Sequence, residues 1–408
     1  MAEASEAARV GRVEFTGSRH ELFLILIRGY ALMLPTIGLY RFWQATWKRR
    51  FYWQNTVIDG EPLEYTGTAT QLLAGFFFAL AFFLPIYIAL FVLSMQESSL
   101  IVLGYLGVGL IIWFLMGYAI YRARDFRLSR TLWRGIRFDQ RGSAWAFALR
   151  RFVWSILFVL SVGLIYPWMA SSLWKYRWRN TWFGDRKLEI AGNWRIFAGP
   201  YFAVYGLNIL TIGGTILWMT STGDYRHAGT SLLPGPISIL AWIGCVIILA
   251  LSCCWYRTRS ASRMLSTVSL GEAKLSVDIG AGPLFWQYVA YVVCLAMLLV
   301  LLLVTFGAVL GSVYAVAVAA GKAPGAVALL SLFQSSTLNV VLLIAAYLVV
   351  LGAFGMLAEL ILSYGWWRLL ARSASIANPD SLNTIRSAPE DRSLIGQGLA
   401  DALNVGAY

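Results

Sequence analysis

Few side chains in this sequence could do chemistry, and the first is an acid inside a long apolar run, Glu359. An ionisable group within a membrane segment is a functional candidate by default, because burying its charge in lipid is expensive. Glu359 also lies towards the basic end of its run, about two turns before Arg368. The alternative is therefore that Glu359 lies at the cytosolic interface and pairs with a basic hairpin.

Two Asn-Thr pairs are the next candidates, Asn55 with Thr56 and Asn180 with Thr181. Each pair follows a basic, aromatic stretch that we expect to be helical, and each begins a predicted strand. Asn and Thr side chains at such a junction can hydrogen-bond to the local backbone, which would give both pairs a structural role. The alternative is a paired, pseudo-symmetric ligand site that uses their amide and hydroxyl groups.

Catalytic and metal-binding motifs are missing from the sequence. It contains no G-x-x-x-x-G-K-[ST], H-E-x-x-H or G-x-S-x-G pattern, and no G-x-G-x-x-G opening a helix. All four cysteines fall within or at the end of apolar runs, and only two histidines are present. Neither a disulfide framework nor a zinc site is expected from this distribution. We therefore predict a protein that is not an enzyme and has no catalytic residue, metal or cofactor.

The composition is typical of a membrane protein. Hydrophobic residues make up 59% of the chain, charged residues make up 13%, and the mean hydropathy is +0.66. An ordinary soluble domain is about half apolar and about a quarter charged. Six uncharged runs exceed the roughly 20 residues that a transmembrane helix needs. The predicted spans are residues 70–95, 100–121, 196–220, 234–256, 284–318 and 338–367.

The net charge of +13 is distributed asymmetrically. Every Lys and Arg except Arg226 and Lys322 falls in a segment that the six predicted spans place on one side of the membrane. This is the positive-inside pattern, and it predicts that both termini are cytosolic. We expect anionic lipid headgroups, and not nucleic acid, to be the partner of this basic rim.

A basic aromatic run followed by a predicted β hairpin organises the chain. In residues 49–67 two short strands flank an Asp-Gly turn, which is the strongest short-range hairpin signal. Three further versions of this unit follow along the chain. The turn and closing residues of the units are Asp59, Gly60, Gly67, Gly135, Gly142 and Gly192. Because an isolated hairpin is only marginally stable, we expect the four units to pair into one small β layer.

The chain also resembles itself at a shift of 125 residues. Ser18 then falls on Ser143, and the segment 53–56 (WQNT) falls on 178–181 (WRNT). Internal duplication of this kind builds many membrane proteins. The predicted organisation is a disordered N-terminal tail (1–11), a first repeat (12–142), a second repeat (143–280), a final pair of spans (281–370) and a cytosolic C-terminal tail (371–408).

Two apolar segments, residues 20–43 and 152–174, each lie between a strand and a basic hairpin. If both crossed the bilayer, half of the basic hairpins would lie outside and the positive-inside bias would be lost. We therefore predict that both enter and leave from the cytosolic side, as re-entrant helix pairs or interfacial helices, with turns at residues 35–38 and 161–163. The alternative is that the uncharged segment 152–174 is an ordinary span. The predicted fold class is an all-α polytopic membrane protein with six transmembrane helices, two such segments and a small cytosolic β layer.

The sequence resembles the YjgN-like (DUF898) family of bacterial inner-membrane proteins. The resemblance rests on residues 38–43 (GLYRFW), 59–67 (DGEPLEYTG) and 398–403 (GLADAL), and it extends over nearly the whole chain. It implies a multi-pass protein of the inner membrane, without implying an activity. It also suggests a membrane-associated metallopeptidase as a partner.

Two functions are compatible with the sequence. The first is a transporter or channel for a small or lipidic molecule, because repeated units and broken helices are typical of transporters. The second is a non-transporting membrane scaffold whose cytosolic β layer binds a partner such as a membrane metallopeptidase.

Overall fold

The computed structural model describes residues 9–95, 100–222, 235–319 and 337–387. Within these ranges six helices are long and apolar enough to cross a membrane, so the prediction of six spans is confirmed. They are Ala69–Ser94, Val102–Ser129, Arg195–Ser221, Ile237–Leu265, Ala281–Ala308 and Ile344–Arg372. Between 0% and 22% of each apolar window is buried inside the chain. Most of this apolar surface is therefore left for lipid or for another membrane protein.

The chain divides into two compact units. The first comprises Met1–Thr16, Ala45–Ala281 and Leu370–Tyr408, and it contains the sheet. The second comprises Gly17–Gln44 and Gly282–Leu369 and is helical where it is described. Of the predicted tails, residues 1–8 and 388–408 lie outside the described residues.

The described strands form one 11-stranded antiparallel sheet in the order β7-β6-β5-β4-β3-β2-β1-β11-β10-β9-β8. A β layer was predicted, and the sheet confirms it. The strands are β1 Val10–Phe15, β2 Thr56–Ile58, β3 Glu61–Tyr65, β4 Thr131–Trp133, β5 Ile136–Gln140, β6 Thr181–Phe183, β7 Arg186–Lys187, β8 Glu189–Ile190, β9 Val268–Leu270, β10 Ala273–Val277 and β11 Ala374–Ala377.

The chain joins the two ends of the sheet. Its order begins with β7 and ends with β8, and these two strands are separated in the chain only by Leu188. The first and last strands also pair, with Val10 opposite Ala377. The sequence placed Val10 and Gly11 in a disordered tail, whereas both belong to β1, because β11 returns from the far end of the chain to pair with them. The two end strands of the order have only two residues each, and very short edge strands are one way in which sheets avoid adding foreign strands.

The hairpin turns follow the predicted chemistry. Asp59 and Gly60 join β2 to β3 with φ values of 50° and 85°, and Arg134 and Gly135 join β4 to β5 with 51° and 72°. Two consecutive positive φ values define the type I′ turn that matches the twist of the flanking strands. The second turn places an arginine where the first has aspartate.

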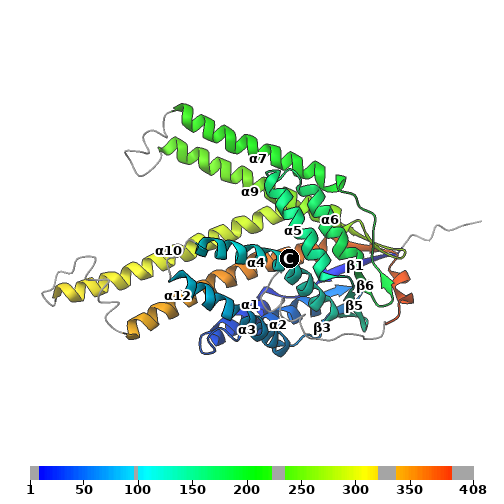
Figure 1. Cartoon of the computed structure of the whole chain (residues 1–408), viewed down its shortest axis with the longest axis horizontal. Coiled ribbons are helices and arrows are strands. Elements are labelled where there is room, and N and C mark those ends of the chain that lie inside the picture. The colour runs from blue at the N-terminus through cyan, green and yellow to red at the C-terminus, as the bar shows by residue number, and fades with distance from the viewer. Residues whose placement is uncertain (1–8, 96–99, 223–234, 320–336, 388–408) are drawn as a thin grey trace, which may run out of the picture. The chain divides into compact units, whose positions relative to one another are not determined.

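The described helices connect strands of the sheet, and within the first unit α7 and α9 lie side by side (Figure 1). Their bounds are α1 Arg19–Met33, α2 Arg41–Gln54, α3 Ala69–Ser94, α4 Leu100–Ser129, α5 Ala144–Leu160, α6 Tyr166–Arg179, α7 Arg195–Thr222, α9 Pro236–Leu265, α10 Ala281–Ala319, α12 Thr337–Leu357, the π-helical turn η1 Ala358–Ser363, α13 Tyr364–Arg372 and the 3-10 helix η2 Pro379–Thr384. Helices α4 and α9 continue about two turns beyond the ends expected from the apolar runs.

The helices between two strands are called a helical excursion here. Each helical excursion in the described part of the chain leaves one strand and returns to the neighbouring strand of the sheet. Helices α1 and α2 connect β1 to β2, α3 and α4 connect β3 to β4, and α5 and α6 connect β5 to β6. Helices α7 and α9 connect β8 to β9, and the last helices connect β10 to β11. All five strand pairs are antiparallel neighbours. Every excursion therefore begins and ends at the same sheet.

The two apolar segments 20–43 and 152–174 each fold as two helices joined by a turn at the predicted break. Ile37 and Gly38 have φ values of 50° and 80° in the first turn, and Val162 and Gly163 have 51° and 89° in the second. These residues are 125 positions apart. Glycine suits the second position because positive φ carries no steric penalty without a Cβ.

The apolar core of the sheet includes residues from the middle and from the C-terminal part of the sequence. Trp133, Phe183 and Ala273 of β4, β6 and β10 form a buried cluster with Leu382 and Ile385. The last two residues lie in η2 and directly after it, so the C-terminal segment contributes to the core of the sheet. On α4, α5 and α6 a separate cluster holds the helices together at the sheet end.

In the helical unit, α1 packs against α12 and η1. The ring of Tyr30 lies against two glycines of α12: a Cβ at Gly352 would be 3.2 Å from its Cδ1, and one at Gly355 would be 2.4 Å from its Oη. The hydroxyl of Tyr364 donates to the carbonyl of Gly17 at 2.8 Å. Small residues on α12 thus permit the close approach of α1, as is usual between helices in membranes.

Candidate functional site

Both Asn-Thr pairs lie where a helix ends and a strand begins. Asn55 Nδ2 donates to the carbonyl of Phe51 at 2.9 Å, and the Thr56 hydroxyl donates to that of Tyr52 at 2.7 Å. In the second pair the Asn180 amide and the Thr181 hydroxyl donate to carbonyls four residues earlier, at 2.8 and 2.9 Å. Each pair thus satisfies carbonyls in the last turn of its helix, where helices lack internal donors.

The structure does not bring the two pairs together. Strands β3, β4 and β5 lie between β2, which begins with Thr56, and β6, which begins with Thr181. The first pair lies beside the end of β1, where the hydroxyl of Thr16 donates to Asn55 Oδ1 at 3.2 Å. The second pair has a different environment, because a guanidinium reaches Thr181.

Arg124 links the sheet end of α4 to α6, β5 and β6. Its Nη1 donates to Gln140 Oε1 at 2.6 Å, to the Thr181 hydroxyl at 2.9 Å and to the carbonyl of Arg177 at 3.2 Å. Its Cζ lies 5.1 Å from the ring of Trp178, within cation–π range. The sequence pointed to Thr181 but not to Arg124, because an arginine at the end of a span is expected to face headgroups or water.

Two further arginines lie close to this contact, Arg151 on α5 and Arg177 on α6. The Nε atoms of both are buried and have no hydrogen-bond acceptor among the described residues. Burial, together with the neighbouring guanidiniums of Arg151 and Arg127, lowers the pKa of Arg177 to about 10. Burial also lowers the pKa of Arg151. The nearest described carboxylate on α4, that of Asp125, accepts from Arg122 at 3.3 Å.

Glu359 lies in the helical unit, on the π-helical turn η1 that follows α12. A π-turn widens the helix by one residue and is frequent at functional sites. The turn packs against α1, and Glu359 lies close enough to Tyr30 of α1 to act on its hydroxyl. Glu359 and the Asn-Thr pairs belong to different units, so they are separate candidates.

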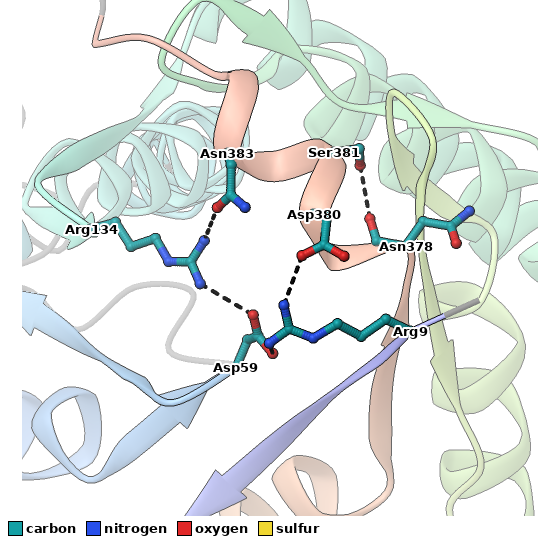
Figure 2. Close-up of polar contacts among 7 residues, drawn as sticks. All are labelled: Arg9, Asp59, Arg134, Asn378, Asp380, Ser381 and Asn383. Carbon is teal, nitrogen blue, oxygen red and sulfur yellow. Dashed lines mark hydrogen bonds and ion pairs between the residues drawn. The ribbon is translucent and has the colours of Figure 1, made fainter. Parts of the chain in front are cut away.

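The turn residue Asp59 has a role beyond the turn. It accepts from Arg9 at 3.3 Å and from Arg134, the corresponding residue of the next hairpin, at 3.2 Å (Figure 2). Arg9 also pairs with Asp380 at 2.7 Å, and Arg134 donates to Asn383. These contacts connect two hairpin turns to η2, so the charged turns hold the C-terminal segment over the apolar core.

The closing glycines occupy equivalent places. Gly67, Gly142 and Gly192 are each the second residue after a strand, namely β3, β5 and β8. Gly142 has a φ of 123°, and a Cβ there would be 2.7 Å from the hydroxyl of Tyr121. A larger residue would therefore collide with α4. Among the described residues no group of three or more His, Cys, Asp or Glu side chains could hold a metal ion.

Six membrane-length helices indicate an integral membrane protein, and the same chain forms an antiparallel sheet. Residues 10–402 match the model of a family described as a bacterial protein of unknown function, DUF898. The chain belongs to this YjgN-like family, as the motifs around Gly38 and Asp59 indicated. No curated protein and no solved structure matches the chain.

Proposed function

We propose that this chain is an integral protein of the bacterial inner membrane that transports a small or lipidic molecule. In this proposal the sheet and both termini lie in the cytosol. The protein is not an enzyme, and it needs no cofactor. Transport uses the six spans together with the two helix hairpins α1–α2 and α5–α6.

The observation that carries the proposal is the return of every helical excursion to the same sheet. A charged sheet can lie on only one side of a bilayer. The two shorter excursions must then come back to the side they left, whatever depth they reach. With turns after 15 and 17 helical residues, each arm is shorter than the roughly 20 residues needed to span. This supports the re-entrant or interfacial placement of residues 20–43 and 152–174.

The hydrogen bonds of the two helix hairpins support an internal duplication. Gly38 N donates to the Met33 carbonyl and Gly163 N to the Phe158 carbonyl, both at 2.8 Å and 125 residues apart. The Ser18 hydroxyl caps α1, and that of Ser143, again 125 residues later, caps α5. Helix hairpins repeated in this way are typical building units of transporters.

The topology is tested by labelling single cysteines in a chain whose native cysteines are replaced. Glu61→Cys follows the first helix hairpin, Lys187→Cys follows the second, and both positions are exposed. In right-side-out membrane vesicles we expect a membrane-impermeant maleimide to label neither position until detergent is added. Labelling of either position in intact vesicles would place that hairpin outside and overturn the proposed topology.

Transport is tested in proteoliposomes. A fluorescent phosphatidylglycerol is quenched by external dithionite only in the outer leaflet unless the protein moves it across. We expect complete quenching if the substrate is lipidic, or a conductance in potassium chloride if the path is aqueous. Neither lipid movement nor conductance from correctly inserted protein would refute transport of these substrate classes.

Anionic lipid headgroups are the proposed partner of the basic rim. Arginines lie over tryptophan rings close to the helix ends: Arg50 over Trp47 at 5.6 Å and Arg141 over Trp182 at 4.3 Å. Paired Trp and Arg side chains are characteristic of the membrane–water interface. Negatively charged lipids attract such residues by about 1 kcal/mol per charge near the surface.

The second candidate is a membrane scaffold that binds a partner such as a membrane metallopeptidase. The low burial of the spans favours it, because so much apolar surface could accept another membrane protein. The short end strands restrict the way in which the β layer could contribute, since two-residue strands offer a partner little edge to extend. Native mass spectrometry of the purified protein separates the two candidates, because a scaffold retains a protein and a lipid transporter retains lipid.

A further inference from the structure

Two buried donors need an acceptor that the described residues do not provide. The Nε–H groups of Arg151 and Arg177 are both buried and unpaired. A guanidinium stays charged at neutral pH, so neither group can avoid the penalty by losing its proton. A buried unpaired polar group costs about 1–3 kcal/mol, and more when it is charged. Two such groups side by side need an explanation beyond packing.

The surroundings of these donors are cationic. Arg127 lies close enough to act on the guanidinium of Arg177. Three nearby acceptors already receive hydrogen bonds from Arg124, namely the carbonyl of Arg177, the Thr181 hydroxyl and Gln140 Oε1. The groups that act on Arg177 are thus other guanidiniums, which repel it. An anion would satisfy the donors and relieve this repulsion at the same time.

The first half of the chain shows that the fold does not require these polar residues. At the shift of 125 residues, Arg151 corresponds to Leu26, Arg177 to Tyr52 and Gln140 to Phe15. All three counterparts are buried hydrophobic residues, with exposures of 0%, 7% and 8%. In the first half Phe15 and Tyr52 stack with their ring centroids 6.2 Å apart. At these three positions the second half therefore has two cations and an amide, where the first half has apolar core residues.

From these observations we infer that Arg151 and Arg177, with Arg124 and Arg127 beside them, form a binding site for a phosphate oxyanion. Guanidinium groups match phosphate geometry and form charge-assisted hydrogen bonds that are roughly twice as strong as neutral ones. Arg124 is the positioning residue, because its three contacts fix α4 against α6 and β6. The ligand's oxygens would accept from the Nε–H groups of Arg151 and Arg177.

The phosphate could belong to a lipid headgroup or to a free phosphate ion. The site lies where α4 and α6 end at the sheet, which is the bilayer interface in the topology proposed above. The lipid source rests on that proposed function, since it requires this end of the helices to lie at headgroup depth. The free ion does not depend on the topology.

The first half of the chain supplies the test variant. Arg151→Leu combined with Arg177→Tyr installs the residues that the corresponding positions already tolerate. The control, Arg150→Ile combined with Arg179→Gln, also removes two charges and installs first-half residues, but Arg150 and Arg179 are exposed. A third variant, Arg151→Lys with Arg177→Lys, keeps both charges and removes the Nε–H donors. It remains informative if the first variant fails to fold.

Binding is measured in phosphate-free detergent micelles. Inorganic phosphate is titrated while thermal unfolding is followed, and phosphatidylglycerol is added separately while retained lipid is counted by native mass spectrometry. We expect one of the two ligands to bind the wild type and the control variant alike. The Leu/Tyr and Lys variants should lose at least about tenfold in affinity, the amount expected for one lost charge-assisted donor. Stabilisation by inorganic phosphate identifies a free-ion site, and retention of phosphatidylglycerol alone identifies a headgroup site.

Equal binding of both ligands by the wild type and the Leu/Tyr or Lys variant would overturn the site. So would equal losses in the test and control variants, because the effect would then be diffuse surface charge. Failure of the proposed topology gives a different result, since the cysteine positions would be labelled from outside while binding in micelles stayed intact. The two hypotheses can therefore fail independently.

Discussion

Replacing Leu382 by alanine should release the C-terminal segment from the sheet. The side chain is 7% exposed and packs in the cluster of Trp133 and Phe183. Alanine removes three carbons, which at about 0.8 kcal/mol each amounts to roughly 2.4 kcal/mol of transfer free energy. A cavity adds to this loss, and measured Leu→Ala changes in cores run from about 2.7 to 5 kcal/mol. We therefore expect the free energy of opening this segment to fall by about 3 kcal/mol.

Hydrogen exchange measured by mass spectrometry reports this opening directly. The amide of Asp185 donates to the carbonyl of Arg386 at 3.1 Å, and the amide of Arg386 donates to Asp185 Oδ1 at 3.1 Å. Both amides lose protection when the segment leaves the sheet. A change of about 3 kcal/mol corresponds to exchange roughly 100-fold faster at these amides.

Leu382→Met is the matched control, because volume-conserving swaps usually cost less than about 1.5 kcal/mol. Exchange in the helical unit should stay unchanged in both variants. If Leu382→Ala exchanges no faster than Leu382→Met at Asp185 and Arg386, the segment does not depend on burial of this side chain and the reasoning fails.

Three further predictions concern single positions. Gly355→Ala should lower the stability by about 1–3 kcal/mol through overpacking against the Tyr30 hydroxyl, and adding Tyr30→Phe should restore most of this loss. Thermal unfolding in micelles measures both variants. If Tyr30→Phe restored no stability, the contact between Tyr30 and Gly355 would be contradicted. Gly142→Ala should lower the unfolding midpoint more than Gly135→Ala, because both have positive φ but only Gly142 faces a close neighbour. Because the pKa of Arg177 is lowered to about 10 from its ordinary value, the unfolded chain holds this proton to higher pH than the folded protein does. In phosphate-free buffer the stability of the wild type relative to Arg177→Met, which has no titrating side chain, should therefore be flat below pH 10 and rise above it. Chemical unfolding at pH 8 and pH 11 measures this change, and a change of the opposite sign would show that a partner stabilises the arginine.

The spans and hairpin turns could be predicted because their signals are local. Uncharged runs of membrane length stand out by composition, and Asp59-Gly60 is a strong turn pair. The apolar runs predict ends for α4 and α9 that come too early in the sequence, because both helices continue into basic segments where the apolar signal stops. Such extensions carry Arg124 and its neighbours to the sheet.

The strand order of the sheet and the arginine site could not be predicted, because both depend on distant partners. Strands β7 and β8 have two residues each, too few for any periodic pattern. The pairing of β1 with β11 joins the two ends of the sequence. Arg151 and Arg177 lie in segments rich in arginine, where a solvated rim is the ordinary interpretation. Only the packing distinguishes the buried donors from the exposed ones.

The pairing of the first and last strands has a consequence for biosynthesis. The ribosome makes β1 before the other described strands, but its neighbour β11 is made after the six membrane-length helices. While the intervening helices are inserted one pair after another, the growing sheet must wait with open ends. Completion of the sheet is therefore a step that follows translation of nearly the whole chain. A chain that stops before residue 374 lacks β11, so it leaves the ribosome with β1 and β10 unpaired on one side, and unpaired strand edges are prone to aggregation.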